Sequence, residues 1–536
     1  MPGSSMSPLA ALPDPTDLAA LREALAAEDP DHRLVPLDLD RVVIGPHAVD
    51  AVADVVAAQL ARTGRPDSGP VVVLVDTTPI RRAGTDLKAL VEDQLQARFG
   101  GEREVRRVVL RGHHPTLHVD DEALDTATDA TADASAVVSV GGGTITDIAK
   151  VATGRSGAAR AGTGAAQETA GQGGIPLVVV QTAASVDGYT DNVSVVLRDG
   201  VKRTIPSRWP DVVVADVATI AEAPEQLNTA GYGEVLSMFT APADWYLASA
   251  FGLDASFHTA PRNLLVALGR GLEDWSPGVA QRDPAAVEQL TRVLVGRGIA
   301  TGVAGTTACL SGVEHVVSHM LDMHHGAHGL PIGLHGAQVG VASVVAAAAW
   351  EHLFTTFDPA APGVPTDALF PGTEAVQRRK PAVLAAFAEL DPAGRLGEEC
   401  WRDYSDKLNR WTAARRSAEA VFADWDRHRA QIRELLVDFR TLAAGLVAAG
   451  APARFAELDP SVDDATARWA VGHCHLMRNR FTVVDLLDLL GRWTPDDRAA
   501  VMAAAAAAVD SAHDSTHDST HGSAHGSTHG APAVAR

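Results

Sequence analysis

Between residues 39 and 218, short valine-rich runs alternate with segments that have the periodicity of helices. Two of these runs, 71–75 and 137–140, are apolar at almost every position, as is typical of strands that helices cover on both faces. Strands that alternate with helices predict a parallel sheet of the dinucleotide-binding type. We expect its strands at 41–44, 71–75, 105–110, 137–140 and 175–181. A separate hairpin is expected to pair 193–197 with 201–205 around an Asp-Gly turn.

From about residue 219 onward, helical periodicity replaces the valine-rich runs. The expected helices are 231–251, 261–272, 284–301, 307–320, 336–352, 374–389, 405–447, 464–479 and 483–490. In the first half, a Gly- and Ala-rich stretch over 152–174 is expected to be a flexible insertion. A short helix is also expected near the N-terminus, over about 15–27, with Asp17 or Thr16 as its cap.

The composition excludes several classes of protein. The chain has 67 Asp and Glu against 45 Lys and Arg, a net charge of −22, which argues against a protein that tracks nucleic acid or an anionic membrane. Its 46% of hydrophobic residues exclude global disorder, and its three cysteines are too few for a disulfide framework. No stretch is typical of a secretory signal or a membrane span. We therefore expect a soluble cytoplasmic protein without a nucleic-acid partner.

A glycine-rich turn follows the second of the two apolar runs. Gly141, Gly142 and Gly143 precede Thr144 and Asp147, and a helix is expected to begin there. Glycines let backbone N–H groups approach an anion closely, and the N-terminus of a helix adds partial positive charge. The segment therefore predicts a pyrophosphate-binding site. A tight strand-to-helix turn without a ligand is the alternative for this segment alone.

Polar residues also follow two other expected strands. Asp76 ends one of them, where a carboxylate can accept hydrogen bonds from ribose hydroxyls and would repel a 2′-phosphate, so it favours NAD over NADP. Thr182, Ser185 and Asp187 follow the strand at 175–181, at the end of the sheet where ligands bind in such folds. An ordinary turn at the first position and a capped loop at the second are the structural alternatives.

Histidines are concentrated in the middle of the chain, at positions 315, 319, 324, 325, 328 and 335. His315 and His319 are four apart, and so lie on one face of an expected helix. Together with Glu234, which opens another helix, His315 and His335 supply one carboxylate and two imidazoles. That set can bind a divalent metal and leave coordination positions open for a substrate. Packed or exposed histidines without a metal are the alternative.

Eight motifs in this order resemble those of sn-glycerol-1-phosphate dehydrogenases. That family lies within the wider superfamily of iron-containing alcohol dehydrogenases, glycerol dehydrogenases and 3-dehydroquinate synthases. The motifs are 141–147 (GGGTITD), 182–189 (TAASVDGY), 210–216 (PDVVVAD), 230–235 (AGYGEV), 243–245 (ADW), 311–315 (SGVEH), 334–336 (LHG) and 477–482 (MRNRFT). The resemblance covers about residues 40–350 and 465–493.

The resemblance implies an α/β dinucleotide-binding domain followed by an all-α domain, as in dehydroquinate synthase-like folds. It implies a metal- and NAD(P)-dependent reduction of dihydroxyacetone phosphate, or a similar ketone, to the alcohol. Glu234, His315 and His335 would be the metal ligands, with zinc expected and nickel or iron as alternatives. His319 would contact the substrate and relay a proton to its oxygen. Asp187 would be a second substrate-contacting residue.

The cofactor cradle implied by the resemblance comprises 141–147 and 182–185, with Asp76 on the ribose. Asp191 stands near the cofactor at a position where the family usually has Ser. Glu234 stands where the dehydrogenases usually have Asp. A longer carboxylate can still bind a metal, although it shifts the ligand by about an ångström.

A phosphorylated substrate would need local cations, because the chain as a whole is acidic. Lys202, Arg203 and Arg208 follow the loop of Asp187 and are the candidates. The alternative for each of them is a solvated position on the hairpin.

The chain is thus expected to have four parts. These are an N-terminal extension (1–38), an NAD-binding α/β domain (39–218), a helical metal and substrate domain (219–510) with an insertion at about 352–463, and a disordered His-rich tail (511–536). We expect a homo-oligomer. Two other functions remain open: an NAD- and metal-dependent sugar-phosphate cyclase, a lyase like 3-dehydroquinate synthase, and a non-catalytic relative.

Overall fold

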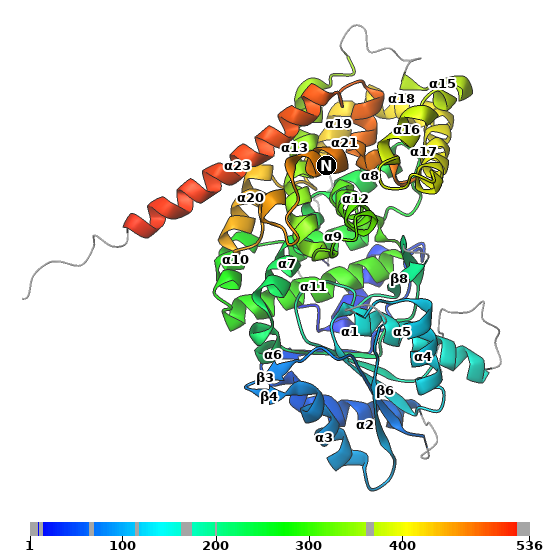
Figure 1. Ribbon diagram of the computed structural model, residues 1–536, viewed down its shortest axis with the longest axis vertical. Helices are drawn as coiled ribbons and strands as arrows, with labels where there is room; N and C mark the ends of the chain where they lie inside the picture. Colours follow the sequence, from blue (N-terminus) through cyan, green and yellow to red (C-terminus); the bar gives the residue numbers. More distant parts are fainter. Residues whose placement is uncertain are drawn as a thin grey trace, which may run out of the picture.

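The computed structural model describes residue 9 and residues 14–63, 69–112, 117–161, 174–198, 201–360 and 369–522. Figure 1 shows a sheet with its helices at one end of the molecule and a larger helical region at the other. The last helix, α23 (Pro495–Gly522), projects away from this body. The arrangement agrees with the predicted α/β region followed by a helical region.

The main sheet has six strands: β1 (Arg41–Gly45), β2 (Val71–Val75), β5 (Val105–Val109), β6 (Ala136–Gly141), β7 (Leu177–Gln181) and β10 (Val212–Asp216). All pairs are parallel, in the order β1-β10-β7-β6-β2-β5. Four of these strands, β2, β6, β7 and β10, are buried at every position, which explains why the sequence has continuous apolar runs there.

Two small antiparallel pairs accompany the main sheet: β3 (Arg81–Arg82) with β4 (Thr85–Asp86), and β8 (Val193–Arg198) with β9 (Val201–Pro206). The second pair is the hairpin that the sequence predicts, and its strands begin at the expected residues. The sequence did not predict the first pair.

Helices cover both faces of the sheet. They are α1 (Leu18–Glu28), α2 (Val52–Thr63), α3 (Leu87–Phe99), α4 (Asp121–Thr131) and α5 (Gly143–Ala161). The apolar sides of α2 and α3 pack on one face, and those of α4 and α5 pack on the other. As predicted, Asp17 caps α1 by accepting a hydrogen bond from the N–H of Ala20.

The helix α5 is longer than the sequence suggests. It continues to Ala161, so the first part of the stretch expected to be a flexible insertion is helical, and 162–173 lie outside the described residues. Alanine has the highest helix propensity, and the inner side of this segment is buried against α4. There Ser156 and Thr131 share a hydrogen bond of 3.1 Å.

The order of the strands creates a switch point between β2 and β6. The chain adds β5 on one side of this pair, and β7, β10 and β1 lie on the other. In open α/β sheets, ligands bind beyond the carboxyl ends of the strands at such a point. Because Val75 pairs with Val140 and Gly141 pairs with Gln181, the residues that follow these strands share one edge of the sheet.

Every regular element that the described residues form after β10 is a helix. The longer ones are α6 (Val217–Glu222), α7 (Glu225–Val235), α8 (Ala241–Ala250), α9 (Thr259–Leu268), α10 (Leu272–Ala280), α11 (Pro284–Ala304), α12 (Val313–Ala327), α13 (His335–Thr356), α15 (Thr373–Gln377), α16 (Lys380–Phe387), α17 (Arg395–Ala413), α18 (Arg415–Ala423), α19 (Trp425–Arg433), α20 (Phe439–Ala448), α21 (Asp464–His473), α22 (Val483–Leu489) and α23. Short 3-10 turns separate some of them, such as η3 (Leu236–Phe239) and η6 (Cys474–Leu476). The single long helix expected at 405–447 is wrong: this segment forms the end of α17, then α18, α19 and α20.

The centre of the helical region is α13, which packs against α7, α12, α20 and α23. By length and composition alone, α13 could cross a membrane, but 78% of its apolar window is buried inside the protein. It is therefore the core helix of this region.

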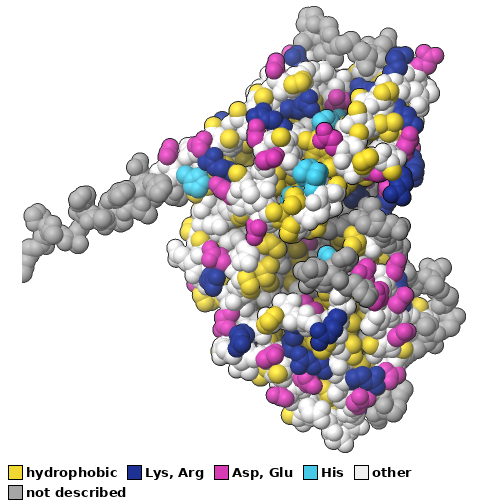
Figure 2. Space-filling view, in the orientation of Figure 1, with side chains coloured by type: hydrophobic (Ala, Val, Ile, Leu, Met, Phe, Trp, Pro, Cys, Tyr) yellow, Lys and Arg dark blue, Asp and Glu magenta, His cyan; other side chains and the backbone are white. Residues whose placement is uncertain are grey.

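The C-terminal helix α23 runs past residue 510, where the sequence predicts a disordered tail. An uninterrupted alanine run over 503–508 precedes this point, and neither Pro nor Gly follows it before Gly522. The remaining tail, 523–536, lies outside the described residues. On the face drawn in Figure 2, acidic and basic side chains are interspersed over the surface, with no continuous basic stripe among the described residues.

Candidate active site

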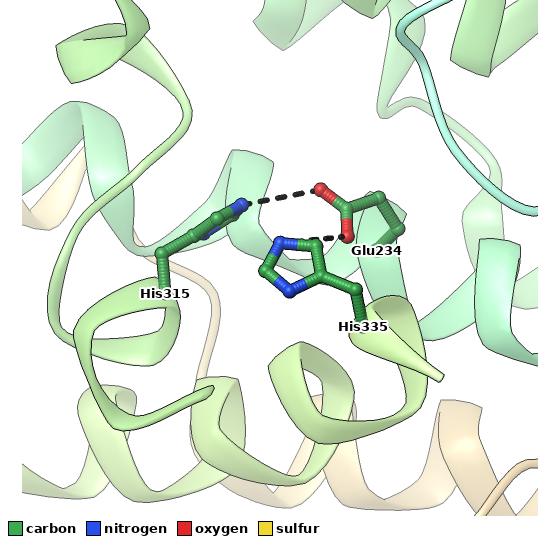
Figure 3. A group of neighbouring side chains, drawn as sticks. All are labelled: Glu234, His315 and His335. Carbon is green, nitrogen blue, oxygen red and sulfur yellow. Dashed lines mark hydrogen bonds and ion pairs between the residues drawn. The ribbon is translucent and has the colours of Figure 1, made fainter. Parts of the chain in front are cut away.

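Three helices bring one carboxylate and two imidazoles together. Glu234 lies near the end of α7, His315 near the start of α12, and His335 is the first residue of α13. Figure 3 shows the three side chains pointing toward one another, and their ligand atoms all lie within 4.8 Å of each other. Glu234 is 3% exposed. The donor set and its spacing suit a divalent metal.

Glycines allow the close helix packing that this convergence needs. A Cβ on Gly336 would lie 2.1 Å from the carbonyl oxygen of Ala230, and a Cβ on Gly233 would lie 2.3 Å from the carbonyl oxygen of Gly336. Larger side chains at these positions would push α7 and α13 apart. The glycines therefore place Glu234 directly beside His335.

Each imidazole is oriented by a hydrogen bond that its Nδ1 donates. His315 Nδ1 lies 3.1 Å from the buried carboxylate of Glu314, which only accepts, so this nitrogen donates. His335 Nδ1 lies 2.8 Å from Ser318 Oγ, whose own proton goes to Gln338. In both rings Nε2 is left to face Glu234, and such bonds commonly fix metal-binding histidines.

The two oxygens of Glu234 have different surroundings. Oε1 lies 3.2 Å from His315 Nε2 and 3.0 Å from Arg297 Nη2. Oε2 is buried, has no hydrogen-bond partner among the described residues, and lies 3.9 Å from His335 Nε2. A buried carboxylate oxygen without a partner is costly, and a cation at this point would satisfy it. The residues present therefore fit a metal ion.

The opposite charges at this site stabilise each other, and they shift the pKa values of both His315 and Glu234. Burial alone would lower the pKa of His315, but the Glu234 and Glu314 carboxylates raise it to about 9. Burial would raise the pKa of Glu234, yet His315, His335 and Arg297 hold it well below its usual value. An ionised Glu234 is the form that can bind a metal.

His319 lies one turn after His315 on α12. It is partly exposed, and its ring centroid is 5.6 Å from that of His335. The helical spacing predicted from the sequence thus puts a third imidazole beside the candidate ligands. Its role as a proton relay stays a prediction.

Arg297, which the sequence analysis did not single out, joins the site from α11. It is fully buried, at 0% exposed, and its Nη2 also lies 3.1 Å from Asp187 Oδ2. The structure thereby links the predicted substrate-contacting acid to Glu234. A signal was present in the sequence, since Arg297 is the one charged residue in the stretch 293–304, which otherwise consists of small and apolar residues.

The predicted cofactor residues lie along the carboxyl edge of the sheet. A Cβ on Gly142 would meet only the hydroxyl of Tyr189, 4.0 Å away, so the space before α5 is open. Thr182 follows β7 at the same edge, and Ser185 lies in the loop beyond it. The carboxylate of Asp76 accepts hydrogen bonds from Lys88 Nζ, at 2.5 Å, and from Thr78.

Two of the predicted cofactor residues instead hold a buried lysine. Lys150 Nζ lies 2.6 Å from Asp191 and 3.0 Å from Asp147, and it also donates to the carbonyl oxygen of Gly188. Burial raises the pKa of Asp191 to about 7, although Lys150 opposes this. Asp191 is thus paired with Lys150, and the three side chains tie α5 to the loop of Asp187.

The three expected phosphate-binding cations have different positions. Lys202 lies on β9, and its side chain is outside the described residues. Arg203 pairs with Glu399 of α17, and Arg208 pairs with Asp211 at 2.6 Å. The two arginines therefore have structural partners. The sequence could not show the partner of Arg203, because Glu399 is far away along the chain.

Comparison with known proteins agrees with this fold. Residues 43–224 match the family model described as "Iron-containing alcohol dehydrogenase". The solved structure of glycerol dehydrogenase from Schizosaccharomyces pombe is similar in fold, with a TM-score of 0.51 and 16% identity over 90% of this chain and 93% of that one. The class is that of the iron-containing alcohol dehydrogenases.

Curated relatives show which family within this class the chain belongs to. The glycerol-1-phosphate dehydrogenase (NAD(P)+) of Haloquadratum walsbyi is 30% identical over 314 residues, which cover 58% of this chain and 77% of the relative. The protein of the same name from Bacillus velezensis is 24% identical over 455 residues, covering 84% and 92%. The chain belongs to the glycerol-1-phosphate dehydrogenase family, as its motifs predicted.

Proposed function

We propose that this protein is a metal-dependent, NAD(P)-linked dehydrogenase that reduces dihydroxyacetone phosphate to glycerol-1-phosphate. The observation that carries the proposal is the convergence of Glu234, His315 and His335, with one buried carboxylate oxygen left without a hydrogen bond. Membership of the family supplies the reaction class. The three-ligand set leaves positions open for a substrate oxygen, as a catalytic metal requires.

The α/β region would bind the cofactor, and the helical region would bind the metal and the substrate. Gly141, Gly142 and the first turn of α5 would hold the pyrophosphate of NAD(P), since backbone N–H groups and the helix N-terminus favour an anion. Asp76 would face the adenosine ribose. The nicotinamide would then lie over the loop of Thr182 and Asp187, toward the metal ligands.

At the reacting end, Glu234, His315 and His335 would hold a divalent metal, with zinc preferred over nickel or iron. The metal would polarise the substrate carbonyl and stabilise the negative charge that develops on its oxygen. His319 would give its proton to that oxygen, and the imidazole would then recover a proton from solvent, to which it is partly exposed. Lys202 remains our candidate for the phosphate group.

We also propose the wider setting of this activity. The protein would work in the cytoplasm as a homo-oligomer. Its chain would divide at about 38 and 218 into an extension, a cofactor domain, and a metal and substrate domain that ends with α23. The segment 352–463 would be an insertion in the third part, and α15 to α20 lie within it.

A spectrophotometric assay tests the proposal. The protein is stripped of metal, reloaded with Zn²⁺, Ni²⁺ or Fe²⁺, and mixed with dihydroxyacetone phosphate and NADH or NADPH. We expect the nicotinamide absorbance to fall only in the metal-loaded samples. If NADH or NADPH is not consumed with any of these metals, the proposal is wrong. Release of phosphate from a heptulose phosphate without net change in NADH would instead indicate a cyclase.

The variant His315→Ala supplies the matched test of the metal site. It removes one ligand, and we expect it to lose both bound metal and activity. Metal content can be measured directly by elemental analysis of the purified variant. An unchanged metal content would show that the ligands are elsewhere in the chain.

A further inference from the structure

The guanidinium of Arg297 is buried between two carboxylates of the candidate active site. Its Nη2 lies 3.0 Å from Glu234 Oε1 and 3.1 Å from Asp187 Oδ2. Nη1 donates to Ser237 Oγ at 3.0 Å. A planar guanidinium with several donors holds carboxylates in fixed directions, which a flexible ammonium does not do.

Backbone packing fixes the position of this arginine. The two glycines that flank it have no room for a side chain: a Cβ on Gly298 would lie 2.4 Å from the carbonyl oxygen of Asp187, and a Cβ on Gly296 would lie 2.4 Å from Leu268. The helix α11 is therefore pressed against the loop of Asp187. The backbone of Arg297 is thereby fixed beside the site.

The contact with Arg297 makes the two oxygens of Glu234 unequal. Oε1 receives the guanidinium, whereas Oε2 lies on the side of His335 and has no hydrogen-bond partner among the described residues. A carboxylate can bind a metal through one oxygen or through both. Because Arg297 takes up one lone pair of Oε1 and Oε2 has no hydrogen-bond partner among the described residues, Oε2 is the oxygen better placed to act as a ligand.

We propose that Arg297 is a positioning residue that restricts Glu234 to one metal-binding oxygen and thereby keeps a coordination position open for the substrate. This inference rests on the metal site proposed above. It has a consequence for affinity, because a fixed positive charge beside the site repels the metal. Arg297 thus weakens metal binding and favours turnover.

Replacing Arg297 with the uncharged, similarly long Met separates this role from a purely structural one. In Arg297→Met, the guanidinium no longer occupies Oε1 of Glu234 and the repelling charge is gone. We expect the metal to bind at least tenfold more tightly and kcat to fall at least tenfold. A residue needed only for packing would weaken metal binding and lower kcat together.

Two further variants keep the test decisive if Arg297→Met folds poorly. Arg297→Lys retains the positive charge but not the planar guanidinium, and its metal affinity should lie between those of the parent and Arg297→Met. The double variant Arg297→Met with Asp187→Asn removes one charge of each sign. It should bind metal more tightly than Asp187→Asn alone. Metal affinity is measured by competition with a chromophoric chelator, so this readout needs no activity.

The outcomes separate this inference from the proposed function. If the parent protein binds no metal that depends on His315, the proposed metal site itself fails. If the parent binds metal but folded Arg297→Met binds it with equal or lower affinity, only the inference about Arg297 is overturned. If Arg297→Met binds metal more tightly and turns over more slowly than the parent, both the proposed metal site and the inference about Arg297 are supported.

Discussion

At the scale of single residues, the candidate site depends on side chains that hold other side chains. Glu314 and Ser318 direct the two histidines, Arg297 holds Glu234, and Lys150 ties the loop of Asp187 to α5. The sequence predicted the three ligands because carboxylate and imidazole residues are recognisable from type and motif. It did not predict their partners, since these contacts depend on which helices meet.

The first prediction concerns Glu314, which is fully buried and accepts the Nδ1–H of His315. In Glu314→Gln the charge that orients and strengthens this ligand is lost. We expect metal affinity to fall about 10- to 100-fold while the protein stays folded. A chelator competition assay measures this, and an unchanged affinity would mean that Glu314 does not support the ligand.

At the scale of secondary structure, the sequence predicted five of the six strands of the main sheet and missed β10, but it located the strands better than the helix boundaries. Buried parallel strands have a clear signature in continuous valine runs. The segment 405–447 has none of the usual breakers before Gly445, yet it contains three breaks between helices, after Ala413, Ala423 and Arg433. Tertiary packing of Trp411 and Trp425, both buried, favours separate short helices there, and no local pattern reports this.

Close packing of α7 on α13 leads to a second prediction. A methyl group on Gly336 would meet the carbonyl oxygen of Ala230 at 2.1 Å. Gly336→Ala should therefore lower the free energy of unfolding by about 2 kcal/mol, and it should weaken metal binding by displacing His335. Chemical denaturation and metal titration measure the two effects.

Gly326→Ala is the control for that substitution. Gly326 lies on α12, and a Cβ there would meet nothing within 4 Å. This variant should be neutral or stabilised by up to about 1 kcal/mol. Equal effects at both glycines would argue against the close approach of α7 and α13.

A third prediction concerns acid stability of the region around η6. Burial lowers the pKa of His475 from 6.5 to about 3, and its Nδ1 has no hydrogen-bond partner among the described residues. Between these pH values the unfolded chain binds a proton that the folded chain does not. Stability is therefore lost as the pH falls below about 6.5, by up to about 4 kcal/mol near pH 3.

Replacing His475 with Gln, which does not titrate, tests this effect. The free energy of unfolding of His475→Gln should depend less steeply on pH between about 6.5 and 3 than that of the parent. His47→Gln is the control, because that side chain is 77% exposed. Parallel pH curves for His475→Gln and the parent would contradict the prediction.

At the scale of the whole molecule, the candidate metal site joins parts of the chain that are far apart in sequence. A bound ion would connect α7, α12 and α13. A ligand that binds only the folded state stabilises it by about 2.7 kcal/mol at 100 times its dissociation constant. Zn²⁺ should thus raise the Tm of the parent protein and leave that of His315→Ala unchanged, as calorimetry can measure. A similar rise in both would place the stabilising ion at another site.

The overall architecture could be predicted because the alternation of strands with helices and the order of the motifs agree with one family. The course of the segment 352–463 could not, because the resemblance does not extend over it. The C-terminal tail was also predicted incorrectly at its start, where α23 continues to Gly522. Local sequence composition indicates disorder there, but a helix that is already formed can extend at little cost.

Activity measured as a function of metal occupancy tests most directly whether the reaction depends on the proposed metal site. Metal-free protein is titrated with Zn²⁺ in a chelator buffer. The buffer fixes the free metal concentration, so that Zn²⁺ bound by the histidines of the tail does not change it. Reduction of dihydroxyacetone phosphate by NADH is followed at each point. We predict no activity without metal, a one-site saturation curve for the parent, and none for His315→Ala. Full activity in metal-free protein, or an equal curve for His315→Ala, would contradict the central claim.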